Sequence, residues 1–110
     1  MINDNESSIQ DVQPTPRKAH RKVWDVPLGQ IVATRNAADQ LPNNVILIAL
    51  ARHCSGDWGD VCPEDWQSNN AAMVHGNRLL SAYCSLTGVK FWIITEWDRS
   101  ITTILLPEDY

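Results

Sequence analysis

The sequence predicts an α+β domain with a C-terminal three-stranded antiparallel meander and two helices packed on one face of the sheet. Three observations predict this fold. Two β-rich runs near the C-terminus flank the polar segment 96–100, which is typical of a hairpin with charge at its tip. The segments 43–54 and 63–75 carry the start and end signals of helices. An earlier β-rich run, 28–34, is a candidate fourth strand.

Length and composition are those of one globular domain. The chain has 110 residues, of which 44% are hydrophobic and 20% charged. It contains no apolar run of about 18 residues, and its N-terminus is polar and acidic, so we expect neither a membrane span nor a secretory signal. Three cysteines without regular spacing predict no disulfide framework. Together these features favour a cytoplasmic protein.

Charge is unevenly distributed along the chain, whose net charge is −4. Residues 1–25 are polar and predict a disordered tail, followed by a single domain over 26–110. Four of the nine cations lie in this tail, at Arg17, Lys18, Arg21 and Lys22. They indicate either a solvated linker or an arm that binds nucleic acid or a partner. The acidic remainder disfavours binding of a phosphate backbone by the folded domain.

The first half of the domain predicts one strand and two helices. Pro27 precedes the strand 28–34, and 35–40 predicts a turn or a short helix. The run after Pro42 is apolar on nearly all sides. Its length favours a helix over 43–54, although its β-branched start leaves a strand open. Such a helix is expected at the centre of the core.

The helix 63–75 is the best marked in the chain. Pro63 suits a first helical position, and Glu64 with Asp65 complements the positive end of the helix dipole. Gly76 is a typical stop signal, and His75 suits the last turn.

Three strands are predicted after this helix, over 78–84, 89–96 and 101–106. Side chains on both faces of the middle strand are apolar, so we expect a central strand that a helix covers on at least one side. An edge strand at 101–106 or 28–34 could pair across a dimer, so both a monomer and a homodimer stay open.

The sequence also resembles a group of small bacterial proteins carried largely on plasmids, phages and other mobile elements. The resemblance covers residues 28–110 and combines Gly56-Asp57-Trp58-Gly59 with Ile93-Ile94-Thr95-Glu96-x-Asp98-Arg99-Ser100-x-Thr102-Thr103. Some members carry the label of a type I restriction subunit M. This chain is too short for a methyltransferase domain and lacks the motifs that bind S-adenosylmethionine or an extruded base. The resemblance therefore implies a mobile-element setting. Trp97, the segment 36–44 and the tail depart from the pattern.

Two segments are candidate partner-binding surfaces. In the loop 56–59, Asp57 and Trp58 could contact a partner, or Trp58 could fold onto the core while Asp57 caps a turn. At the hairpin tip, Glu96, Asp98 and Arg99 could form a contact site, a catalytic acid pair with an anion clamp, or a salt-bridged turn.

Two tryptophans lie next to predicted strands: Trp24 precedes the first strand, and Trp97 is in the hairpin tip. Trp97 beside these charges is typical of a binding anchor, whereas both Trp97 and Trp24 could instead pack over the sheet edge. If Trp97 is exposed, the hairpin tip is the preferred contact site.

The remaining chemistry-bearing residues match no known site. The spacing of the histidines and cysteines fits no zinc pattern, and nothing in the sequence indicates an activated thiol. These residues are His53, Cys54, Cys62, His75 and Cys84. We therefore expect no metal, cofactor or catalytic residues. The favoured hypothesis is a small non-enzymatic modulator that binds a protein, with a host defence complex (restriction or CRISPR) as the target. Alternatives are a nucleic-acid-binding accessory factor using the tail, and a small hydrolase using Glu96 and Asp98.

Overall fold

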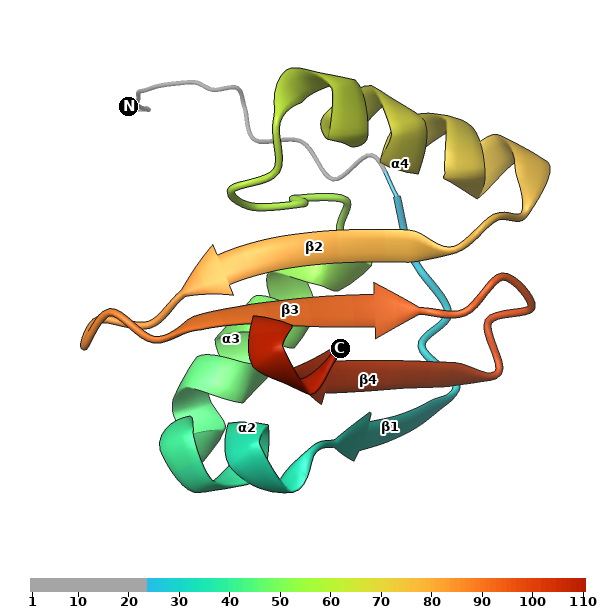
Figure 1. Ribbon diagram of the computed structural model, residues 1–110. Helices are drawn as coiled ribbons and strands as arrows, with labels where there is room; N and C mark the ends of the chain where they lie inside the picture. The colour runs from blue at the N-terminus through green and yellow to red at the C-terminus, as the bar shows by residue number, and fades with distance from the viewer. Residues whose placement is uncertain (1–23) are drawn as a thin grey trace, which may run out of the picture.

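The α+β class is confirmed by the computed structural model, which describes residues 24–110 (Figure 1). The predicted basic stretch at 17–22 lies outside the described residues. The elements comprise a four-stranded sheet, three α-helices and one 3-10 turn. Their bounds are β1 (Gln30–Ala33), α2 (Arg35–Gln40), α3 (Asn43–Cys54), α4 (Pro63–His75), β2 (Leu79–Cys84), β3 (Lys90–Thr95), β4 (Ile101–Leu105) and η1 (Pro107–Asp109).

The sheet has the order β1-β4-β3-β2. β2, β3 and β4 form the predicted antiparallel meander, and β1 adds the fourth strand, parallel to β4. The suggestion that 101–106 forms a free edge is wrong, because β4 lies between β1 and β3. Within the described chain the free edge is therefore β1.

The predicted helix bounds are confirmed for α3 and α4, since both follow local signals. Proline precedes α3 and opens α4, and Gly76 ends α4 in the left-handed conformation at φ 74°. The segment after β1 forms the short helix α2, capped where the Ala37 N–H donates to the Thr34 hydroxyl at 3.2 Å.

α3 and α4 occupy different places around the sheet. In Figure 1, α3 lies behind the sheet and α2 lies at the lower left next to the end of β1, whereas α4 runs along the β2 edge. Asn69 on α4 closes this edge. Its Nδ2 donates to the Leu80 carbonyl at 2.7 Å, and the Leu80 N–H donates to its Oδ1 at 3.1 Å. The next outward-facing backbone groups of β2 belong to Ala82. Its N–H donates to the Trp58 carbonyl, and its carbonyl accepts from the Asp60 N–H. The β2 edge is thus paired, as natural sheets require.

One side of α3 packs on the sheet and the other faces solvent. Ala49, Leu50 and His53 are buried against the strands. Leu47 and Ile48, however, are 65% and 61% exposed. The expectation that this helix lies at the centre of the core is wrong, because the described chain forms no layer beyond it.

Part of the opposite face of the sheet, over β3 and β4, is covered by the C-terminal segment, drawn in red in Figure 1. The Asp109 carboxylate accepts hydrogen bonds from the side chains of Thr34 and Asn36, both at 2.7 Å. The Tyr110 ring lies edge-on to Trp92 with centroids 5.7 Å apart. No helix in residues 24–110 is long and apolar enough to cross a membrane.

Candidate functional site

The turn between β3 and β4, residues 96–100, presents an exposed indole. We call this turn the tip. It lies at the right of Figure 1, between the β3 arrowhead and the start of β4. The Glu96 N–H donates to the Ile101 carbonyl at 3.0 Å, and the Arg99 N–H donates to the Glu96 carbonyl at 2.9 Å. Trp97 between them is 67% exposed. The candidate binding anchor Trp97 is therefore accessible to a partner.

Arg99 has a structural role at the tip. Its guanidinium donates to the carbonyls of Asn77 at 2.6 Å, Glu96 at 3.1 Å and Ala72 at 3.1 Å. Ala72 lies in the last turn of α4, where the helix dipole favours a cation, and its carbonyl also accepts from the Gly76 and Asn77 N–H groups. These bonds hold the Arg99 backbone at φ 61°, an uncommon value for a non-glycine residue. Arg99 is thus a clamp between the tip and α4, with its donors directed into the protein.

The two carboxylates of the tip have separate environments. Asp98 Oδ1 accepts from the Ser100 hydroxyl at 2.6 Å and from the Ser100 N–H at 3.1 Å. These two hydrogen bonds lower the pKa of Asp98. Glu96 instead pairs with Arg78, whose Nε lies 3.6 Å from Oε1. No carboxylate pair with a shared proton forms here.

Arg78 also extends the tip surface toward the C-terminus. Its Nη1 donates to the Tyr110 hydroxyl at 2.7 Å, and its guanidinium carbon lies 5.8 Å from the Tyr110 ring centroid. The Tyr110 and Glu96 side chains raise the pKa of Arg78. This surface thus carries, in order, the Trp97 indole, the Glu96 carboxylate, the Arg78 guanidinium and the Tyr110 phenol.

The loop 56–59 lies away from the tip. Its Asp57 carbonyl accepts from the Tyr83 hydroxyl at 2.7 Å, near the C-terminal end of β2. The tip is at the N-terminal end of β2, where Leu79 pairs with Thr95. The two candidate surfaces are therefore separate.

Trp58 is a core residue. Its side chain is 0% exposed, and its Nε1 donates to Asn70 Oδ1 at 3.0 Å. The same oxygen accepts from Trp24 Nε1 at 3.2 Å, so Trp24 anchors the start of the domain and is partly buried. The prediction of Trp58 as a contact residue is wrong, because burial of its large ring outweighs exposure on a short loop.

Asp57 has a partner within the chain. Arg52 donates to both its carboxylate oxygens, at 2.7 and 3.2 Å, and stacks 4.7 Å from the Tyr83 ring centroid. This two-point pairing suits the planar guanidinium. Asp57 thereby fixes the loop to the end of α3.

A buried chain of hydrogen-bonded polar side chains runs across the sheet. The sequence did not predict this feature. His53 Nδ1 lies 2.6 Å from Ser81 Oγ, and Nε2 lies 2.9 Å from Thr95 Oγ1. Thr95 Oγ1 lies 2.7 Å from Thr102 Oγ1, which donates to the Leu28 carbonyl at 2.7 Å. A carbonyl only accepts, so Thr102 must donate to it and accept from Thr95.

This order of donors fixes the tautomer of His53. Because Thr95 donates to Thr102, its oxygen accepts from Nε2–H. Burial, with a smaller effect of the Arg99 charge, lowers the pKa of His53 from 6.5 to about 4. The imidazole is therefore neutral at pH 7, and its unprotonated Nδ1 accepts from the Ser81 hydroxyl. His53 and Ser81 are both fully buried, so a substrate cannot reach this serine–histidine pair, and we assign it a structural role.

Residues 24–110 hold no group of three or more His, Cys, Asp or Glu side chains that could bind a metal ion. Comparison with protein-family models, curated proteins and solved structures found no match. The resemblance to mobile-element proteins stays a prediction.

Proposed function

We propose that the protein is a small non-enzymatic binding protein that docks on a partner protein through the tip, with Trp97 as its anchor. The single observation that carries this proposal is the exposure of Trp97 on a turn held by bonds to α4. Tryptophan is among the residues that most often dominate binding energy at protein interfaces.

The rigidity of the tip supports a docking role. The Arg99 clamp and the Asp98–Ser100 bonds hold the turn before any partner arrives. A preorganised anchor loses less conformational entropy on binding than a mobile one. Backbone held at an uncommon φ by surrounding bonds is frequent at functional sites.

Charge indicates the chemistry of the partner. The described chain holds ten acidic and five basic side chains, a net charge of −5. Asp98 and Glu96 flank Trp97, with Glu96 paired to Arg78, while the Arg99 charge is directed to backbone carbonyls. A fitting partner offers an apolar pocket for an indole ring with basic groups at its rim.

The mobile-element setting implied by the sequence resemblance suggests the identity of this partner. Proteins encoded on plasmids and phages meet host defence machinery, so we propose a restriction or CRISPR complex as the target. The protein would act by covering a functional surface of that complex.

The test is affinity capture from a host lysate with the full-length protein, followed by mass spectrometry. We expect a stoichiometric basic partner with the wild type and its loss with Trp97→Ala. Val74→Ala is the matched control, because Val74 is an equally exposed apolar side chain on α4, 71% exposed. The proposal fails if no stoichiometric protein is recovered, or if both variants retain the same one.

The hydrolase alternative has less support. Asp98 is fixed by Ser100 and Glu96 by Arg78, so the two carboxylates do not form an acid–base pair. A double variant, Glu96→Gln with Asp98→Asn, would retain any hydrolytic activity measured for the wild type.

A further inference from the structure

The outer side of α3 carries an apolar stripe next to a groove. The stripe consists of Asn44, Leu47, Ile48 and Ala51, of which Asn44 is the polar end, at the spacing i, i+3, i+4, i+7 that places side chains on one helix face. All four are exposed. This spacing is typical of a helix that packs on another helix.

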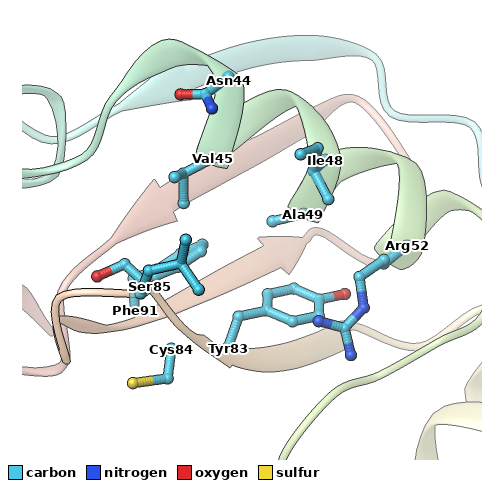
Figure 2. A pocket seen from close by; sticks show the side chains of 10 residues that line it. Asn44, Val45, Ile48, Ala49, Arg52, Tyr83, Cys84, Ser85 and Phe91 are labelled. Carbon is cyan, nitrogen blue, oxygen red and sulfur yellow. The ribbon is translucent and has the colours of Figure 1, made fainter.

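The groove lies between α3 and the turn that joins β2 to β3 (Figure 2). Its volume is about 250 Å³. Ile48 and Arg52 form part of one wall, and Tyr83 and Leu86 form part of the other. Leu86 is fully exposed, so the apolar surface continues from the stripe across the groove. Such a continuous patch on a small protein marks an interaction site.

Charge favours a second copy of the chain as the occupant of this surface. The stripe and the groove walls contain no Asp or Glu, although the rest of the described chain holds ten acids and four cations. Two copies therefore meet here without the repulsion that other surfaces would cause. A basic partner, in contrast, would find no acid to pair with.

The stripe is also complementary to itself. If two α3 helices cross antiparallel about a two-fold axis between Leu47 and Ile48, these residues of both copies form one apolar cluster. The same operation places Asn44 of each copy beside Ala51 and Arg52 of the other. The amide oxygen can then accept from the guanidinium at both ends of the crossing.

We infer that the protein forms a homodimer through the α3 stripe, with the two helices antiparallel. The β2–β3 turn and the tip lie at opposite ends of β3 (Figure 1), so the dimer leaves both tips free. It would present two Trp97 anchors, which increases avidity for a partner with two sites. The inference does not depend on the proposed function of the tip.

Sedimentation equilibrium of the full chain tests the inference. We expect a monomer–dimer transition between about 1 and 300 µM, because a patch of one short helix face is at the small end of stable interfaces. Leu47→Glu combined with Ile48→Glu should weaken dimerisation at least tenfold. Both sites are exposed, so circular dichroism should show an unchanged fold. The controls Val74→Glu and Trp97→Ala should dimerise like the wild type.

Substitutions of Asn44 test the antiparallel arrangement. Asn44→Glu should tighten the dimer several-fold, since each new carboxylate would meet Arg52 of the second copy, and Asn44→Lys should weaken it. In a parallel dimer each Asn44 would face itself, so both substitutions would weaken association. That outcome would overturn the arrangement.

A dimer that resists the Leu47/Ile48 double substitution would overturn the inference, as would a monomer at every concentration. In a monomer, nuclear Overhauser effects between the Leu47 and Ile48 methyl groups and residues 1–23 would show that the chain's own N-terminal segment is the occupant.

Discussion

The Arg99 guanidinium donates to the Ala72 carbonyl at 3.1 Å and thereby joins the turn that carries Trp97 to the C-terminal end of α4. Residues 27 positions apart in the sequence thus share one small substructure. Its consequence is that the Trp97 indole is held in solvent by a rigid turn.

Removal of the clamp should weaken both the fold and the docking surface. We expect Arg99→Ala to reduce the free energy of unfolding by about 2 kcal/mol, because hydrogen bonds to three carbonyls are lost. Arg99→Gly should cost less than Arg99→Ala, since glycine adopts φ 61° without strain, which is worth about 1 kcal/mol. Urea denaturation gives this order. Equal losses in the two variants would mean that the backbone at this site is not strained.

Acid should destabilise the protein through His53. Its pKa falls from 6.5 in the unfolded chain to about 4 in the folded one, so between these pH values the unfolded state binds a proton that the folded state excludes. Stability from this group is complete above pH 6.5 and decreases as the pH falls toward 4, by about 3 kcal/mol in total.

The matched variant for this effect is His53→Gln, which keeps a donor and an acceptor in the buried chain. Chemical denaturation at several pH values should give a shallower dependence on pH for the variant than for the wild type. Identical slopes between pH 4 and 6.5 would show that His53 titrates normally in the fold.

Substitution of Trp58 should destabilise the fold, whereas substitution of Trp97 should not. Trp58→Phe should lower the free energy of unfolding by about 2 kcal/mol, because the buried ring loses volume and the Asn70 amide loses a donor. Trp97→Ala should change it by less than about 0.5 kcal/mol, as is usual for exposed sites. Thermal denaturation of both variants measures the difference. A large loss for Trp97→Ala would place the indole in a packed environment.

Much of the fold could be predicted because its signals are local. Pro63 and Gly76 mark the ends of α4 directly, and runs of β-branched and aromatic residues mark the strands. The parallel pairing of β1 with β4 could not be predicted, since a strand pattern contains no direction. The position of α4 depends on Asn69, whose bonds to the β2 edge exist only in the assembled fold.

The candidate site was predicted in part. The sequence places Trp97 at a hairpin tip but leaves open whether it is exposed or packed over the sheet edge, and the structure shows it exposed. Burial of Trp58 depends on Asn70 and Leu79, which come later in the chain. The buried polar chain left a signal in Ser81 and Thr95, which are polar residues on the inner face of otherwise apolar strands. Only the tertiary contacts with His53 show that these two residues belong to one hydrogen-bonded series.

The most direct test of the account is the affinity of the full-length protein for its captured partner, measured by titration calorimetry with wild type and Trp97→Ala. We predict a loss of at least about 30-fold for Trp97→Ala, the level expected of a dominant anchor, and no change for Val74→Ala. Equal affinities of wild type and Trp97→Ala would contradict docking through the tip.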